Sequence, residues 1–244
     1  FDVLDKVKKQ RAPWEFEIIV IDSESNDGTA ELLSKYSGIK YFPILKEQFG
    51  HGKTRNLGVE LSEGEYIAFL TQDAIPLNDF WLYNLVVLLQ HYDKAAGVFG
   101  AHIAHDSANF FITKEINDHF KGFLSYPLSF SKDSDVDNYK NNLQWRQALH
   151  FYSDNSSCLK RSVWKEIPYR DVKYGEDQLW AYDVTEAGYA KVFSPDSVIK
   201  HSHDYSPEET FERSTIDGDY FNFFWGYKVV NEEIILRGCQ MHKE

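Results

Sequence analysis

The chain has 244 residues, enough for one sizeable α/β domain, and its 26 basic and 38 acidic side chains give a formal net charge of −12. This charge argues against nucleic acid or another polyanion as the main partner, while a local pocket can still bind a small anion. Cys158 and Cys239, the two cysteines, stand in unrelated contexts, which favours a reducing, cytosolic compartment over a disulfide framework. The sequence contains no run of about 18 apolar residues, so it predicts no transmembrane helix.

The first half of the sequence alternates between strand and helix patterns. Residues 16–23 are a continuous apolar run that ends in an acid, which is typical of a strand buried in a parallel sheet. Five further elements are predicted in chain order: a helix within 26–36, a strand over 39–45, a helix over 53–61, a strand over 66–70 and a helix with Asn78 as its N-cap. This alternation predicts an α/β fold with a single open, mostly parallel, doubly wound sheet.

The second half of the sequence is less regular. Its polar segment 131–142 is predicted to be a mobile surface loop. The elements predicted after this segment are a strand over 156–159, a helix over 161–167, a helix over 176–187 that ends at Gly188, and two short strands within 190–203. The aromatic segment 220–230 fits either a helix packed on the core or a contact with a membrane surface or lipid substrate.

Acidic residues stand at the ends of two predicted strands. Asp22 and Glu24 close the first strand, and Asp73 follows the strand over 66–70. Ligands of such sheets bind at the carboxyl ends of the strands, where the sheet holds a side chain rigidly. Asp22 is equally well placed to cap the following helix, whereas Asp73 lies several residues too early to cap the helix after it.

Two further pairs of ionisable residues are candidates for chemistry. Glu176 and Asp177 begin a predicted helix, where the helix dipole alone favours acids, but the preceding Gly175 lets the chain turn sharply just before them. His201 and His203 are separated by one residue, so on a strand they point to the same face. That arrangement favours a metal or phosphate site over two core histidines, and an exposed pair is the alternative.

Together these side chains suit group transfer from a phosphate-activated donor. Mg²⁺ and Mn²⁺ bind through one or two carboxylates and substrate phosphates, and Mn²⁺ also accepts imidazole. One aspartate, one histidine and a diphosphate would therefore complete a metal site. A separate carboxylate would remain free to act as general base on an acceptor hydroxyl.

Five segments in order make the chain resemble the inverting family 2 glycosyltransferases with the GT-A fold: EIIVIDSESNDGTAELL, HGKTRNLGVELSEGEYIAFLTQDAIP, DNSSCLKRSVWKEI, YGEDQLWAYDVTEAGY and VIKHSHDYSPEETFERS. Within the family, FLTQDA and HSHDYS are most similar to bacterial rhamnosyltransferases of surface polysaccharide synthesis. The resemblance implies a single GT-A domain over 1–244. Its implied parts are a nucleotide-sugar-binding half (1–105), an acceptor and catalytic half (106–218) and an aromatic tail (219–244).

The resemblance also implies roles for the matching residues. Asp177 is the expected catalytic base, and Glu176 beside it orients the acceptor. Asp73 matches the metal-binding acid of the family's D-x-D, in which this sequence has Thr71 and Gln72 at the first two positions. His201 or His203 would complete a Mg²⁺ or Mn²⁺ site with it. The residues implied to bind the nucleotide sugar are Asp22, Glu24, Arg55, Asn56, Gln72, Asp73 and Arg213.

The resemblance predicts a metal-dependent inverting transferase that moves L-rhamnose from dTDP-L-rhamnose to a saccharide or lipid-linked saccharide acceptor. Its expected location is the cytoplasm or the inner face of the cell membrane, with a peripheral membrane contact. The family opens with a strand and a loop that packs on the nucleotide, and this sequence starts after them, so its sheet is expected to lack the first strand. The sequence indicates no oligomeric state.

Three other functions are alternatives to this prediction. The same fold with a UDP-sugar donor is the first alternative. A noncatalytic carbohydrate-binding relative is the second, and the retained Asp73, Glu176, Asp177 and histidine pair count against it. A dinucleotide-dependent oxidoreductase requires G-x-G-x-x-G after a strand, and the sequence has no such motif.

Overall fold

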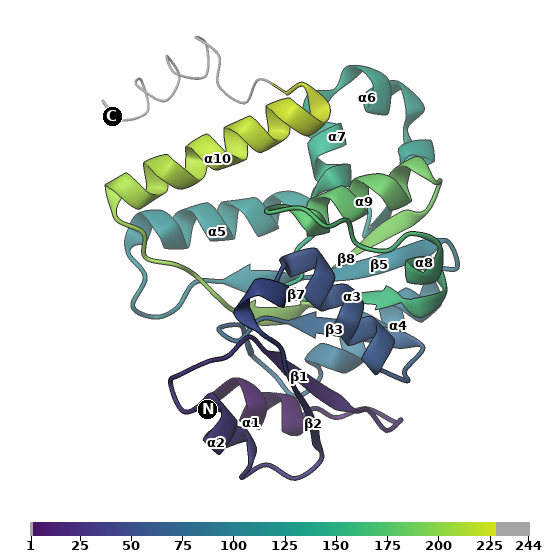
Figure 1. Cartoon of the computed structure of the whole chain (residues 1–244). Coiled ribbons are helices and arrows are strands. Elements are labelled where there is room, and N and C mark those ends of the chain that lie inside the picture. The colour runs from purple at the N-terminus through teal and green to yellow at the C-terminus, as the bar shows by residue number, and fades with distance from the viewer. Residues whose placement is uncertain (1, 228–244) are drawn as a thin grey trace. The chain divides into compact units, whose positions relative to one another are not determined.

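The computed structural model describes residues 2–227 (Figure 1). The chain divides into two compact units, Phe1–Ser202 and His203–Glu244, and each is described by itself. Three features of the sequence lie wholly or partly outside the described residues: Cys239, the end of the aromatic segment (228–230) and the tail beyond it to residue 244. None of the helices in the described part of the chain is long and apolar enough to cross a bilayer.

The first half of the larger unit contains the predicted alternation of strands and helices. Its elements are α1 (Asp2–Lys8), β1 (Ile18–Asp22), α2 (Thr29–Leu33), β2 (Ile39–Pro43), a 3₁₀ helix (Lys46–Gln48), α3 (His51–Leu61), β3 (Tyr66–Leu70), β4 (Ile75–Pro76), α4 (Trp81–His91) and β5 (Ala95–Ile103). One predicted detail is wrong, because Phe80 and not Asn78 is the N-cap of α4. The Asn78 side chain instead accepts from the Phe80 N–H at 2.8 Å, which forms a turn just before the helix.

The rest of this unit has more helix than the sequence predicts. Its elements are α5 (Phe110–Phe123), β6 (Ser129–Phe130), a 3₁₀ helix (Lys132–Ser134), α6 (Val136–Asn141), α7 (Leu143–His150), β7 (Ser156–Lys160), α8 (Arg161–Glu166), α9 (Glu176–Glu186) and β8 (Ala190–Lys200). The predicted loop over 131–142 is wrong. Polar side chains cap the helices in it: Asp135 accepts from the Asn138 N–H at 2.9 Å, and Asn142 accepts from the Trp145 N–H at 3.2 Å.

One strand, β8, replaces the two short strands predicted within 190–203. It pairs with β5 at both ends, and the register shifts between Ala95 and Gly97 and again where Gly100 faces Ser194 and Ala101 faces Val198. The extra residues 195–197 form a bulge. A Cβ at Gly100 would lie 2.2 Å from the Ser197 carbonyl oxygen, so only glycine fits beside this bulge.

Hydrogen bonds divide the described strands into two sheets. β1 and β2 form a parallel pair, and six strands form a sheet in the order β3-β7-β5-β8-β4, with β6 also paired to β8. The predicted α/β class is confirmed, and β3, β5 and β8 run in one direction, whereas β4, β6 and β7 run in the opposite direction. The single sheet is not observed. β7 runs antiparallel to both of its neighbours. The crossover rule constrains connections between parallel strands, so it sets no direction for β7 after the long connection from β5 that contains α5, α6 and α7.

Alternate residues of the central strands fill two cores on opposite faces of the larger sheet. Val98 and Val192 pack with α4 on one face, whereas Phe99 and Phe193 pack with α5, α7 and α9 on the other (Figure 1). The side-chain period of two in a strand explains why neighbouring residues enter different cores. Both faces are covered, which accounts for the continuous apolar runs in the sequence.

The antiparallel direction of β7 matters for the site. Ser156, at the start of β7, pairs with Leu70 at the carboxyl end of β3. Ile103 and Lys200 pair at the carboxyl ends of β5 and β8. The loop before β7 therefore joins the residues that follow β3 and β8 at one edge of the sheet.

The second unit contains α10 (Pro207–Trp225), which begins at Ser206 with a capping box. The Ser206 Oγ accepts from the Glu209 N–H at 3.2 Å, and the Glu209 carboxylate accepts from the Ser206 N–H at 2.8 Å. Gly226 ends the helix in the left-handed region, with φ +66°.

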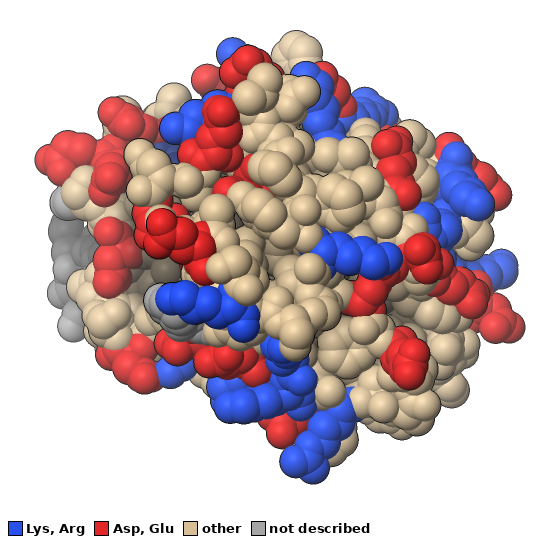
Figure 2. All heavy atoms as spheres, turned by 60° about the horizontal axis from the view of Figure 1, so that its bottom comes forward, with Lys and Arg blue, Asp and Glu red and all other residues tan. Residues whose placement is uncertain are grey.

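The surface charge is mixed on the face drawn in Figure 2, where lysine and arginine side chains lie among acidic ones.

Candidate active site

Two acids begin α9 directly after a tight turn, as predicted. Gly175 adopts φ +70°, a left-handed conformation that glycine reaches without strain. Glu176, which follows it, is only 4% exposed, and Asp177 is half-buried. The turn thus presents one acid to the interior and the next to the edge of the sheet.

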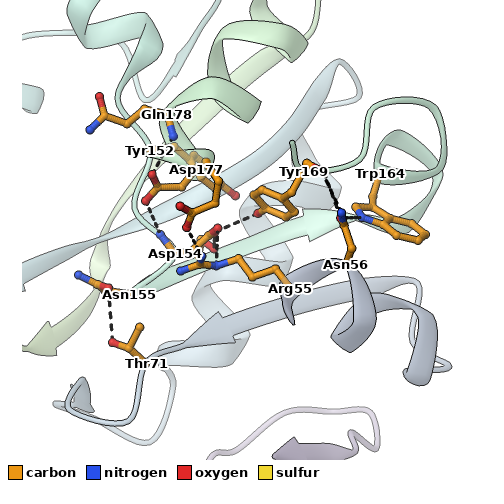
Figure 3. Close-up of polar contacts among 12 residues, drawn as sticks. Arg55, Asn56, Thr71, Tyr152, Asp154, Asn155, Trp164, Tyr169, Asp177 and Gln178 are labelled. Carbon is orange, nitrogen blue, oxygen red and sulfur yellow. Dashed lines mark hydrogen bonds and ion pairs between the residues drawn. The ribbon is translucent and has the colours of Figure 1, made fainter. Parts of the chain in front are cut away.

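An arginine from α3 lies between two buried carboxylates. The Arg55 Nε lies 2.9 Å from the Asp154 Oδ2, and the Arg55 Nη1 donates to the Glu176 Oε1. The Arg55 side chain is 13% exposed and that of Asp154 is fully buried (Figure 3). The two carboxylates raise the pKa of Arg55 against the opposing effect of its burial. We call these three side chains the Arg55–Asp154–Glu176 cluster.

The N-terminal turn of α3 is seated closely against the loop before α9. A Cβ at Gly52 would lie 2.1 Å from the carbonyl oxygen of Arg170. Only glycine allows this approach, which brings Arg55, one turn later, within reach of Glu176. The sequence HGKTRN thus contains both the contact residue and the cation.

Asp154 has no role in the sequence prediction, but the structure surrounds it with polar contacts. Its Oδ1 accepts from the Ser157 Oγ at 2.6 Å and from the Tyr169 hydroxyl at 3.1 Å. Its backbone N–H donates to the Asp177 Oδ2 at 3.4 Å, and the Gln178 N–H donates to the Asp177 Oδ1 at 2.8 Å (Figure 3). The candidate base is therefore held by backbone donors from two separate elements.

The surroundings of Asp177 disfavour its charged form. Burial, followed by the negative charges of Glu176 and Asp154, raises the pKa of Asp177 to about 7, against the opposing effects of Arg55 and the Gln178 N–H. A carboxylate whose pKa lies near neutrality is well matched to accept a proton from a hydroxyl and release it again.

A second cluster lies where β3 and β8 end. The His201 Nε2 is 3.5 Å from the Asp73 Oδ2. Asn155 connects this pair to the chain before β7, since its Nδ2 lies 3.4 Å from the His201 Nδ1 and its Oδ1 accepts from the Thr71 Oγ1 at 3.4 Å. The hydrogen bond with His201 lowers the pKa of Asp73 well below its usual range; burial opposes this effect and Thr71 assists it.

The Asp73 and His201 pair fits a divalent cation by its donor chemistry. One carboxylate oxygen and one imidazole nitrogen are the donors that Mn²⁺ accepts, and Mg²⁺ is bound through carboxylates. The ionised form of Asp73, which a cation requires, is the form that its surroundings favour. The sequence prediction that these residues come together is confirmed by their position, and their binding of metal stays a prediction.

His203 and Arg213 belong to the second unit. The His203 ring stacks on Tyr205 with centroids 5.2 Å apart, and the Arg213 guanidinium lies 5.4 Å from the centroid of the same ring. Their predicted contacts with metal and diphosphate stay predictions.

The acids at the end of β1 form local hydrogen bonds. Asp22 accepts from the Ser25 N–H at 3.2 Å, from the Ser25 hydroxyl and from the Tyr41 hydroxyl at 2.9 Å. It does not cap α2, whose N-cap is Gly28. Glu24 accepts from the Lys46 N–H at 3.1 Å and adopts φ +56°, which is uncommon outside glycine and often marks a functional loop. The predicted nucleotide contacts of both acids remain untested.

Asn56 and Gln72 differ in how far protein contacts engage them. The Asn56 Oδ1 accepts from the Trp164 Nε1 at 2.7 Å and the Tyr169 N–H at 3.1 Å, and its Nδ2 donates to the Tyr169 carbonyl at 2.9 Å (Figure 3). A nucleotide would have to compete with these partners. Gln72 is exposed next to Asp73. Neither predicted contact is tested by the structure.

The sequence reasoning assigned no function to Asp154 or Asn155. Their segment, DNSSCLKRSVWKEI, carries part of the family resemblance, but nothing local shows that β7 runs backwards and brings them between Asp73 and Asp177. The one local signal is the Asp-Asn pair directly before the strand predicted over 156–159.

A sequence model of glycosyl transferase family 2 matches residues 2–167. The chain belongs to glycosyl transferase family 2. Two relatives are O-antigen chain rhamnosyltransferases. RfbN of Salmonella typhimurium is 33% identical, and the match covers 87% of the chain and 65% of RfbN. WbaN of Salmonella anatum is 29% identical, and the match covers 81% of the chain and 60% of WbaN. The family 2 chain thus spans less than two thirds of the length of these relatives.

Solved structures show the same fold for this family 2 chain. TarS 1-349 of S. aureus in complex with UDP-GlcNAc is 17% identical with a TM-score of 0.58, over 95% of the chain and 64% of TarS 1-349. Mannosyltransferase PcManGT from Pyrobaculum calidifontis, in complex with GDP-Man and Mn²⁺, is 16% identical with a TM-score of 0.60. This match covers 85% of the chain and 54% of PcManGT. These likenesses confirm the predicted GT-A class and carry the fold alone.

Proposed function

We propose that this family 2 chain transfers a sugar from a nucleotide diphosphate donor to an acceptor hydroxyl, with Asp177 as the general base. The observation that carries the proposal is the environment of Asp177, which is half-buried at a helix start, held by two backbone N–H donors and has a pKa raised to about 7. Such a group suits proton abstraction from a hydroxyl near neutral pH.

The proposed reaction is a single displacement. Asp177 accepts the acceptor's hydroxyl proton as the acceptor oxygen bonds to the anomeric carbon and the bond to the leaving diphosphate breaks. Attack opposite the leaving group inverts the configuration of the anomeric carbon. The N–H groups of Asp154 and Gln178 hold the carboxylate of Asp177 in place during proton transfer.

Asp73 and His201 are the proposed ligands of a Mg²⁺ or Mn²⁺ ion, and His203 is the proposed third protein ligand or the alternative to His201. When bound, such an ion supplies positive charge to the departing diphosphate. Asn155 contacts the His201 ring from its other side, with its Nδ2 3.4 Å from the Nδ1, and so restricts the orientation of the ring.

The activity of two relatives supports L-rhamnose as the transferred sugar. RfbN and WbaN are O-antigen chain rhamnosyltransferases. We propose dTDP-L-rhamnose as the donor and a saccharide or lipid-linked saccharide of polysaccharide synthesis as the acceptor, with the reaction at the cytoplasmic side of a membrane. UDP-sugars are the alternative donors, because TarS, which has the same fold, binds UDP-GlcNAc.

A donor panel tests this proposal. The chain, extended to the length of its relatives, is incubated with Mn²⁺, a lipid-linked saccharide and one donor at a time: dTDP-L-rhamnose, UDP-N-acetylglucosamine, UDP-glucose or UDP-galactose. Transfer from dTDP-L-rhamnose, with an inverted anomeric centre seen by NMR, is expected. Transfer only from a UDP-sugar would overturn the rhamnose assignment, and retention of configuration would overturn the single displacement.

A further inference from the structure

Asp154 is a fully buried carboxylate beside the candidate base. Burying a carboxylate is costly unless it is paired and hydrogen-bonded, and Asp154 meets both conditions through Arg55, Ser157 and Tyr169. The same residue supplies the N–H that contacts Asp177. A leucine or another apolar side chain at this position would avoid the cost of desolvating a carboxylate, so stability alone does not explain the charge.

We propose that Asp154 is a positioning residue for Asp177: its ion pair with Arg55 fixes the peptide that donates to Asp177, and its buried carboxylate places a negative charge beside the candidate base. This inference rests on the proposed role of Asp177 as general base and extends it to a residue that does not contact substrate.

The first part of the proposal rests on geometry. The Asp154 side chain is anchored at both oxygens, by Arg55 at 2.9 Å on Oδ2 and by Ser157 and Tyr169 on Oδ1. Rotation of the peptide before β7 would break these contacts. The N–H of Asp154 therefore holds a fixed direction toward the Asp177 Oδ2, and it cooperates with the Gln178 N–H on Oδ1.

The second part rests on the balance of charges around Asp177. Glu176 on α9 and Asp154 before β7 are the two carboxyl groups that face Asp177, and Arg55 on α3 is the cation paired with both of them. Burial raises the pKa of Asp154 itself, and the Arg55 guanidinium, followed by the Ser157 hydroxyl, opposes that rise. Two carboxylates against one guanidinium disfavour a third negative charge.

Two further titratable groups lie near Asp177. Burial lowers the pKa of Lys191 on β8, whose Nζ donates to the Ala148 and Phe151 carbonyls, and the negative charge of Asp177 opposes that fall. Burial raises the pKa of Tyr152, whose hydroxyl donates to the Val98 carbonyl at 3.1 Å. The uncharged Tyr152 adds nothing to the balance, and any charge on Lys191 acts in the same direction as that of Arg55.

The titration of Asp177 measures this effect directly. ¹³C NMR of aspartate carboxyl groups follows protonation in the whole protein, and loss of one resonance in Asp177→Asn assigns the signal. The wild-type midpoint is expected near pH 7. A wild-type midpoint near the ordinary aspartate value would overturn the proposal without any variant of Asp154.

Two variants of the cluster give opposite expected results. Asp154→Asn keeps the shape and an oxygen acceptor for Ser157 and Tyr169 but removes the charge, so the Asp177 midpoint should move to lower pH by about one unit. Arg55→Gln removes the cation and should move the Asp177 midpoint to higher pH. The midpoint in the double variant should lie between those of the two single variants. An unchanged or raised midpoint in folded Asp154→Asn would overturn the proposal.

A matched control lies on the same helix. Asp183 of α9 accepts from the Arg170 Nε at 2.8 Å in a more exposed ion pair. Asp183→Asn also removes one carboxylate from an arginine and should leave the midpoint of Asp177 unchanged; an equal shift would show a nonspecific effect and overturn the assignment to Asp154.

Activity separates this proposal from the proposed function. In Asp154→Asn the acidic limb of kcat should move to lower pH with the NMR midpoint, while the KM for the donor stays near wild type. Because the NMR titration requires no substrate, a chain that shows the expected midpoints but transfers no sugar would contradict the proposed function and support the positioning role.

Discussion

The backbone N–H of Asp154 donates to the Asp177 Oδ2 at 3.4 Å, although the two residues belong to a loop before β7 and to the first turn of α9. This contact places the candidate base against the Arg55–Asp154–Glu176 cluster. It also connects both halves of the site, because Asn155, the next residue, contacts His201.

Asp177→Asn should reduce turnover by about 10²–10⁴-fold, the usual contribution of a positioned base. The amide keeps the size of the side chain but cannot accept the proton. Donor affinity, measured by calorimetry with the nucleotide sugar, should barely change because the base contacts the acceptor. Turnover near wild type, or a parallel loss of donor binding, would contradict the assignment and favour Glu176.

The pH dependence of stability should report on the same carboxyl group. Its pKa rises from an ordinary 3.8 to about 7 on folding, so the ionised form is less stable in the folded chain than in the unfolded chain. The cost is absent below about pH 4, grows through the range between the two values and is complete above about pH 7. Asp177→Asn should therefore gain about 1–3 kcal/mol in the free energy of unfolding at pH 8 and almost nothing at pH 4. Urea titrations at the two pH values check this, and an equal gain at both would contradict it.

The acidic limb of activity should follow from the same value. Only deprotonated Asp177 can act as base, so kcat should fall as the pH drops through about 7. Initial rates at saturating donor, between pH 5 and 9, measure the limb. A flat profile across pH 6 to 8 would be inconsistent with Asp177 as the titrating base.

Asp73→Asn should weaken binding of Mn²⁺ and of the donor in Mn²⁺. The amide lacks the charge that the cation requires and loses much of the interaction with His201. Electron paramagnetic resonance of bound Mn²⁺, without substrate, gives the affinity directly. His201→Ala and His203→Ala in parallel identify the imidazole ligand. Asp106→Asn, which removes a surface carboxylate paired with Lys200, is the control and should bind Mn²⁺ as wild type does.

Gly52→Ala should destabilise the seat of α3. The added Cβ would lie 2.1 Å from the Arg170 carbonyl oxygen, so backbone must move at a cost of about 1–3 kcal/mol. Gly122→Ala in α5 is a matched control because a Cβ there meets no atom within 4 Å, and it should gain up to about 1 kcal/mol in a helix. Thermal unfolding of both variants decides between them. Equal stability of the two variants would show that the close contact with Arg170 is unimportant.

The sequence by itself determined the elements and the ends of the strands. Continuous apolar runs predict β1 and β3, although most residues of both strands are only half-buried. Asp22 and Asp73 follow from where those runs stop. Gly175 predicts the turn before Glu176 and Asp177 because a left-handed conformation is a local property of one residue. Each of these signals is contained within a few neighbouring residues.

Only the tertiary structure decided how these pieces meet. β7 runs antiparallel between β3 and β5, and this direction brings Asp154 and Asn155 to the edge where Asp73, His201 and Asp177 lie. The ion pair of Arg55 with Glu176 likewise depends on the close contact of α3 with the loop at Arg170. Strand direction and ion pairing between distant segments depend on register and packing, which no local pattern of residues encodes.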